Sequence, residues 1–247
     1  MCGMRSGNPV LNDRAFERGG KAYGHATMTL DGTVNKAFIL LVILSAGAMV
    51  TWNRYFEGQE VFPLAIGSAI VGLVLALIIA FAHRTAPFLA PVYAAAEGIF
   101  VGGLSAHYES LYRGITLQAV LLTVAVFVAL LLAYKTRLIR ATQNFKLGVF
   151  AATAGIFIMY LLSFVLGLFG VAVPFLHENG WVGIGISLFI VVIAALNLVL
   201  DFDFIESGAR NGLPKHMEWY GAFGLVVTLI WLYLEILRLL AKLRSRD

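Results

Sequence analysis

The sequence predicts an all-α membrane protein, a bundle of seven transmembrane helices. Its 247 residues are 60% hydrophobic and only 13% charged, whereas a soluble domain carries about 25% charged residues. A run of about 20 apolar residues is long enough to cross a bilayer as a helix, and open strands are not viable in lipid. Seven such runs occur, at residues 34–52, 62–82, 88–106, 115–134, 148–170, 181–203 and 218–241.

Polar segments flank these runs. Residues 1–33 lack an apolar stretch and do not resemble a signal peptide, so we expect a flexible cytoplasmic tail there. Residues 34–243 form the predicted transmembrane domain, and residues 244–247 form a short basic C-terminal tail. Because the loops between the runs are short, the seven helices should pack as one compact bundle.

Glycines in two of the predicted helices favour close packing. Small residues let membrane helices approach each other closely. We therefore expect tight contacts where glycines gather in the third and sixth runs, at Gly98, Gly102, Gly103, Gly183 and Gly185.

The distribution of Lys and Arg indicates the orientation. Most basic residues fall in the tail and loops on the side of the N-terminus, and the opposite loops hold only Arg54 and Arg113. This bias places the N-terminus in the cytoplasm. Seven crossings then put the C-terminal tail outside, although it carries Arg244 and Arg246. Seven crossings are the favoured interpretation, and a re-entrant segment with both ends inside is the alternative.

Several function classes lack their residues in this chain. The basic residues lie mostly in loops and tails, where they orient a membrane protein, so we expect no nucleic-acid partner. A single cysteine, Cys2, excludes a disulfide within the chain. A zinc hydrolase needs clustered histidines. A retinal protein needs a lysine in the middle of a helix, and the seventh predicted helix has none before Lys242. The motifs of an intramembrane aspartyl protease are also absent. We expect no enzyme and no cofactor beyond bound or transported Ca²⁺. The histidines are scattered, at His25, His83, His107, His177 and His216.

A short acidic string ends the sixth run. The residues from Trp181 to Leu200 carry no charge, and Asp201 and Asp203 follow them directly. Carboxylates at such a depth are costly and mark candidate functional sites. Residues two positions apart point to nearly opposite sides of a helix. Asn197 lies one turn before Asp201 and extends its face, so we expect Asp201 to face the interior and Asp203 to face the cytoplasmic headgroups.

Three further carboxylates enter the predicted spans. Glu97 lies near the middle of the third helix, Glu218 at the cytoplasmic start of the seventh, and Glu235 deep within the seventh. Arg238 follows Glu235 by three residues, on the same face, where a structural ion pair is the alternative interpretation.

Carboxylates that face the interior of a bundle can serve as a cation site. Their oxygens are the hard ligands that Ca²⁺ prefers. Two carboxyl groups held close together share a proton and titrate as a coupled pair. The acidic residues therefore predict a pH-gated cation site, with Asp201 as the first candidate ligand.

Three passages of this sequence resemble the Bax inhibitor-1 family, also called transmembrane Bax inhibitor motif proteins. Leu200-Asp-Phe-Asp-Phe-Ile205 is similar to the family motif at the end of the sixth helix. Glu218-Trp-Tyr-Gly-Ala-Phe and Leu232-Tyr-Leu-Glu-Ile-Leu-Arg-Leu-Leu240 resemble its seventh helix. Ala86-Pro-Phe-Leu-Ala-Pro91 through Glu97-Gly98 to Gly103 resembles its third. The seven-span layout extends the resemblance over residues 34–243, and it is closest to a bacterial subgroup of uncharacterised proteins.

The resemblance implies an apolar seventh helix at the centre of the other six. It also implies a pH-sensitive calcium leak, gated by an aspartate of the sixth helix paired with one of the seventh. Asp201 matches the first aspartate. When the Leu-Tyr-Leu motif is aligned with that of the family, Glu235 takes the position of the second aspartate. When the alignment is made on Glu218 and Arg238 instead, Thr228 takes that position. Glu235 lies 17 residues beyond Glu218, roughly 25 Å along a helix, so regular helices would keep it away from Asp201.

Two functions follow as expectations. The first is a pH-sensitive calcium leak of the bacterial cytoplasmic (inner) membrane, with Asp201 as the gate or Ca²⁺ ligand. The other candidates for ion or proton binding are Glu97, Glu218, Glu235, Asp203 and Asn197. The second is a modulator without transport activity, which uses residues 1–33 to bind a membrane protease or another membrane partner. In both, the lipid bilayer surrounds the chain.

Overall fold

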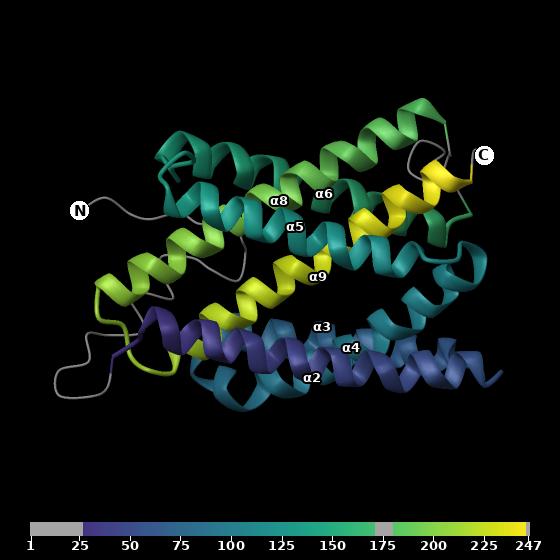
Figure 1. The fold of residues 1–247 in the computed structure, drawn as a ribbon, viewed down its shortest axis with the longest axis horizontal. Coiled ribbons are helices and arrows are strands. Elements are labelled where there is room, and N and C mark those ends of the chain that lie inside the picture. The colour runs from purple at the N-terminus through teal and green to yellow at the C-terminus, as the bar shows by residue number, and fades with distance from the viewer. Residues whose placement is uncertain (1–26, 171–179, 246–247) are drawn as a thin grey trace.

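The computed structural model describes residues 27–170 and 180–245, and these form an all-helical bundle (Figure 1). Seven described helices are long and apolar enough to cross a membrane. In chain order they are α2 (Leu30–Phe56), α3 (Phe62–Phe81), α4 (Ala86–Leu111), α5 (Ile115–Lys135), α6 (Gln143–Leu168), α8 (Trp181–Arg210) and α9 (Met217–Arg244), with the short 3₁₀ helix η1 (His83–Thr85) before α4. The predicted fold class is confirmed.

Several helices extend beyond the apolar runs that predicted them. α2 begins at Leu30 because the Thr29 hydroxyl accepts a hydrogen bond from the Gly32 amide at 3.1 Å. α6 begins at Gln143, where the Thr142 hydroxyl caps the Phe145 amide at 3.3 Å. Such caps satisfy amides that have no partner within the helix. Polar residues therefore continue helices that hydropathy alone ends early.

Part of the expected N-terminal tail belongs to the bundle. Met28 is buried, and its amide donates to the Leu213 carbonyl at 2.7 Å. Thr27 bridges to Pro214, just before α9. Residues 27–33 thus pack against the rest of the protein, and the remainder of the predicted tail, residues 1–26, lies outside the described residues.

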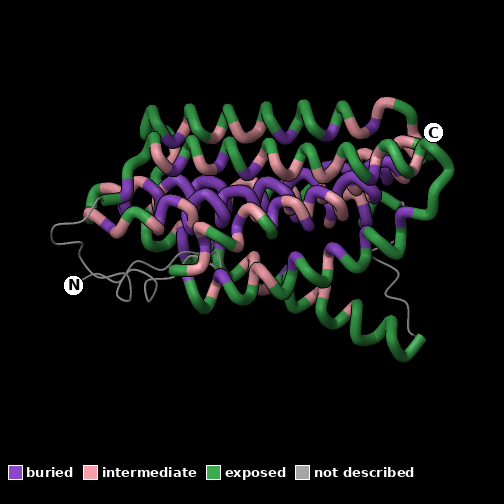
Figure 2. Tube along the Cα trace, turned by 90° about the horizontal axis from the view of Figure 1, so that it is seen from below, coloured by how far each residue is buried: buried purple, intermediate pink, exposed green. Residues whose placement is uncertain are grey.

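Helix α9 occupies the centre of the bundle. It packs against α2, α4, α5 and α8, and buried residues concentrate along the middle of the molecule (Figure 2). The most heavily buried side chains include Tyr220, Phe223 and Leu232 of this helix.

The described chain starts and finishes at opposite ends of the bundle (Figure 1). We call the end where α2, α4, α6 and α9 begin the start end, and the other the far end.

The predicted glycine contacts are found in α4, whereas the one predicted at Gly185 of α8 is not. A Cβ added at Gly98 would lie 2.2 Å from the Leu44 carbonyl oxygen of α2. At Gly102 it would lie 2.2 Å from the Ala48 oxygen, and at Gly103 it would meet Ala65 of α3 at 3.2 Å. The prediction for Gly185 is wrong, because nothing lies within 4 Å of that position.

Candidate functional site

Asp201 lies in the interior of the bundle, on α8. Its side chain is completely buried, and Asn197, one turn earlier, is 2% exposed. The Asn197 amide nitrogen donates to the Thr153 hydroxyl of α6 and to the Ile193 carbonyl, both at 2.8 Å. Asn197 therefore also ties α8 to α6. The shared face of Asp201 and Asn197 is directed into protein, as a helical spacing of four predicts.

Asp203 points to the opposite side and is partly exposed. It accepts hydrogen bonds from the Lys146 ammonium at the start of α6 and from the Tyr134 hydroxyl of α5. Glu206 binds the same tyrosine and pairs with Arg137 at 3.0 Å. Both carboxylates thus belong to an ion-pair network at the start end.

Glu218 is buried at the first turn of α9, where basic residues surround it. It binds the Lys36 ammonium of α2 and pairs with Lys215 at 2.8 Å. One of its oxygens also accepts from the Thr29 amide and hydroxyl, both at 2.9 Å. A buried charge is tolerable when it is paired and hydrogen-bonded. Glu218 therefore joins the start of α2 to the start of α9.

Glu235 forms the ion pair that its spacing to Arg238 suggested. One guanidinium nitrogen, Nη1, lies 3.0 Å from each carboxylate oxygen, and the Tyr160 hydroxyl of α6 donates to Glu235 at 2.9 Å. The carboxylate is nearly fully buried, whereas the Arg238 side chain is 40% exposed. This contact lies near the far end of α9.

Glu97 lies against α3. A Cβ added at Gly72 would sit 2.5 Å from a Glu97 carboxylate oxygen, so the missing side chain of this glycine makes room for the acid. Glu97 is half-buried. None of the hydrogen bonds of Glu97, Glu218 or Glu235 within the described chain involves Asp201. The three carboxylates considered as its partners therefore lie in other surroundings.

The register of α8 against α9 decides between the two alignments of the second aspartate. Gly221 of α9 contacts Ile205 of α8, since a Cβ added there would lie 3.2 Å from the Ile205 side chain. The two helices run in opposite directions with the same rise. Counting from this contact, Asp201 lies level with about residue 225, and Thr228 lies level with the turn between Asn197 and Asp201. Thr228 is 3% exposed. The structure thus puts Thr228 within about one turn of the depth of Asp201, and Glu235 about ten residues beyond that depth.

The described residues do not form a metal cluster. No group of three or more His, Cys, Asp or Glu side chains among them is placed to hold a metal ion. A resident Ca²⁺ takes about six to eight oxygen ligands. The acidic side chains of the described residues around Asp201 therefore supply fewer than three of these ligands.

Two histidines stack beside Asp201's end of the bundle. The rings of His83 and His216 lie 5.5 Å apart and nearly parallel, and the Tyr220 ring is 6.2 Å from His83. Burial, followed by the positive charge of His83 and Arg84, lowers the pKa of His216 below its usual range. His83 belongs to η1 and His216 lies just before α9, so the stacked pair joins η1 to the start of α9.

Sequence reasoning missed the polar stripe of α6. Lys146, Thr153 and Tyr160 bind Asp203, Asn197 and Glu235 in turn. The three α6 residues are spaced by seven, so they lie along one face of the helix. This spacing was visible in the sequence and could have predicted which side of α6 meets the bundle.

Comparison with known proteins identifies the family. The sequence model of the family described as Bax inhibitor 1 like matches residues 8–245. Searches of curated proteins and of solved structures each returned no match. The matched range spans all seven described helices, including the buried Asp201 on α8 and the central α9. The chain therefore belongs to the Bax inhibitor 1-like family of integral membrane proteins.

Proposed function

We propose that this protein is a pH-sensitive cation leak, with Ca²⁺ as the transported ion and Asp201 as its titrating carboxylate. The observation that carries the proposal is the complete burial of Asp201 on α8, among helices that cross the membrane. A carboxylate at such a depth is costly and is usually kept for function. Protonation removes its charge, so the affinity of this position for a cation must depend on pH.

The proposal differs from a paired-aspartate mechanism. The residues of α9 closest in depth to Asp201 run from Leu225 to Thr228, and none of them has a carboxylate. Glu218 and Glu235 are neutralised by Lys36, Lys215 and Arg238. Among the described residues of α9, no carboxylate lies at the depth of Asp201, so the proposal does not require the two protonation steps of a coupled pair of carboxylates.

Calcium flux into dye-loaded liposomes tests the proposal. Wild-type protein should carry Ca²⁺ with a pH-dependent rate. Asp201→Asn should lose most of this pH dependence, because the amide cannot titrate. Asp203→Asn is the matched control: it makes the same chemical change two residues away, in the ion-pair network, and should keep the wild-type pH profile.

An unchanged flux and pH profile in a folded Asp201→Asn protein would overturn the assignment of this residue. No flux from folded wild-type protein would overturn transport itself. The better account would then be the second function, a modulator that binds a membrane protease or another membrane partner. Loss of partner crosslinking after deletion of the first 26 residues would test that function.

We also propose that the start end faces the cytoplasm of a bacterial inner membrane. Lys36, Arg84, Lys146 and Lys215 all belong to this end, and positive charge favours the cytoplasmic side. Cysteine labelling in a Cys2→Ser background tests the orientation. A cysteine at Arg140 should react only in opened cells, and one at Arg113 should react in intact spheroplasts.

A further inference from the structure

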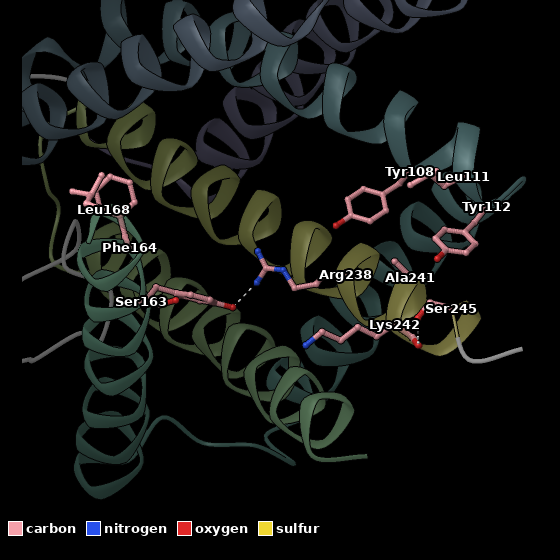
Figure 3. A pocket seen from close by; sticks show the side chains of 12 residues that line it. Tyr108, Leu111, Tyr112, Ser163, Phe164, Leu168, Arg238, Ala241, Lys242 and Ser245 are labelled. Carbon is pink, nitrogen blue, oxygen red and sulfur yellow. Dashed lines mark hydrogen bonds between the residues drawn. The ribbon is translucent and has the colours of Figure 1, made fainter. Parts of the chain in front are cut away.

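A cavity of about 650 Å³ opens at the far end of the bundle, away from Asp201. It lies between the last turns of α4, α6 and α9, and Figure 3 shows its lining side chains. Figure 2 shows α6 leaving the other helices towards its C-terminal end. The volume falls within the range of small-molecule sites, about 300–1,000 Å³. The divergence of α6 therefore leaves a space that can hold the head of a small amphiphile.

Two cations and no carboxylate line this cavity within the described chain. The cations are Arg238 and Lys242, which lie one turn apart on α9. Lys242 is buried, and its ammonium donates to the Gly183 carbonyl at 3.1 Å and to the Ser187 hydroxyl at 2.9 Å, both on α8. These bonds fix a positive charge in the wall. Such a wall attracts an anion.

Arg238 keeps hydrogen-bond donors for a ligand. A guanidinium has five N–H groups. Its Nη1 binds Glu235 and the Tyr160 hydroxyl, whereas Nε and Nη2 make no hydrogen bond with any described residue. A planar guanidinium with remaining donors matches the oxygens of a phosphate group. Glu235 thus orients the guanidinium without using all of its donors.

Hydroxyl groups complete a polar lining. The side chains of Tyr108 and Tyr112 come from the end of α4, and Ser163 comes from α6. In Figure 3 the Tyr108 ring projects from α4 on the side of the cavity facing Arg238. Hydroxyls can donate to phosphate oxygens as readily as they accept. The cavity therefore offers donors from three helices.

The rim of the cavity on the α6 side is apolar and exposed. Phe164 is 66% exposed and Leu168 is 71% exposed, and both line the cavity. These residues belong to a helix that spans the membrane, so their exposed faces meet lipid chains. A free phosphate ion would gain nothing from such a rim, whereas the chains of a phospholipid would pack on it.

We propose that this cavity binds the headgroup of an anionic phospholipid. Arg238 binds the phosphate with its remaining donors, Lys242 adds positive charge to the wall, and the acyl chains leave over Phe164 and Leu168. Basic pockets between transmembrane helices are a recognised way to bind acidic lipid headgroups. The site does not include Asp201, so it stands or falls independently of the proposed function.

Native mass spectrometry of detergent-purified protein with added lipid tests this site. The wild-type protein should retain one phosphatidylglycerol at least tenfold more tightly than phosphatidylcholine. Gly167→Trp should weaken phosphatidylglycerol retention about tenfold, because Gly167 lines the cavity and has open space where its side chain would grow. Gly155→Trp is the matched control: it lies on the same helix, also beside open space, but outside the cavity lining, and it should bind as wild type.

A second variant tests the charge without filling the cavity. Glu235→Gln with Arg238→Gln removes the guanidinium and its partner together, so no buried charge is left without a partner. It should lower phosphatidylglycerol retention about tenfold. Equal retention of the two lipids, or unchanged retention in both the cavity and the charge variant, would overturn the proposal. Inorganic phosphate that raises the melting temperature as much as phosphatidylglycerol would overturn the lipid as the ligand.

Discussion

Helices α4 and α6 are both apolar and rich in glycine, yet they are attached to the bundle in different ways. The α4 glycines Gly98 and Gly102 bring its backbone against α2. The α6 glycines Gly148 and Gly155 have nothing within 4 Å. α6 is instead held by side-chain bonds from its polar stripe. A glycine in a membrane helix therefore marks a contact only where a partner backbone lies opposite.

The two helices also differ in how much of their surface is buried by the rest of the bundle. α4 lies between α2, α3 and α9, and half of its most apolar stretch is buried. The corresponding stretch of α6 is 11% buried. A helix with so little packing relies on directional bonds, and such bonds in membranes contribute only about 0.6 kcal/mol each on average. α6 should therefore be the more easily displaced helix, and the cavity beside its C-terminal end is consistent with that.

The largest expected effect comes from adding one methyl group to the α2–α4 contact. Gly102→Ala places a Cβ 2.2 Å from the Ala48 carbonyl oxygen and 2.4 Å from the Thr51 hydroxyl. Overpacking of this kind costs about 1–3 kcal/mol, and contact with backbone puts this site near the upper value. Thermal unfolding in detergent should show the loss. A melting temperature equal to that of wild type would show that α4 is not held tightly against α2 at Gly102.

The same change in α6 should act in the opposite direction. Gly155→Ala meets no neighbouring atom, and alanine is favoured over glycine within a helix by about 0.8–1.0 kcal/mol. The melting temperature should therefore rise slightly, with Gly148→Ala as a second site of the same kind. A decrease at both sites would show that α6 is packed more tightly than its open glycines indicate.

A smaller effect is expected when one bond of the polar stripe is removed. Thr153→Val deletes the hydroxyl that accepts from Asn197 while keeping the side-chain shape. The loss should be about 0.6 kcal/mol, and hydrogen exchange should accelerate in α6 but not in α4. Thr123→Val is the control, because the Thr123 hydroxyl binds the Ala119 carbonyl of its own helix. Faster exchange throughout the bundle would argue against a local attachment.

The smallest expected effect is on the pH dependence of stability. It comes from His216, which stacks on His83 of η1 just before α4. Because the pKa of His216 is lowered in the folded protein, the unfolded chain, with a pKa of about 6.5, binds more protons in the window between the two values. His216 therefore costs no stability above about pH 6.5 and reduces stability as the pH falls from there towards the folded pKa.

Melting temperatures measured from pH 8 to pH 5 check this sign. His216→Gln should reduce the fall at low pH. His107→Gln, which removes a histidine in edge-to-face contact with Phe62 instead of one stacked on another histidine, should leave the wild-type fall in place. A fall of the same size in His216→Gln and wild type would exclude His216 as its source.

Much of the candidate site could be predicted along the chain, and part of it could not. Asp201 and Asn197 share a helix face by their spacing, and Glu235 with Arg238 form an ion pair at three residues, because both relations are local to one helix. The pairing of Glu218 with Lys36 joins residues 182 positions apart. No periodicity reports such a contact, because it depends on how α2 and α9 are placed side by side.

The sequence by itself determined that this protein crosses the membrane seven times as helices. Apolar length is a property of a continuous segment, and a backbone in lipid must bond within that segment. The tertiary structure was needed to show which glycines are contacts, which carboxylates are neutralised, and that Thr228 lies within about one turn of the depth of Asp201 while Glu235 does not. These outcomes depend on the register between helices. That register is set by the packing of side chains from separate segments, which no single segment contains.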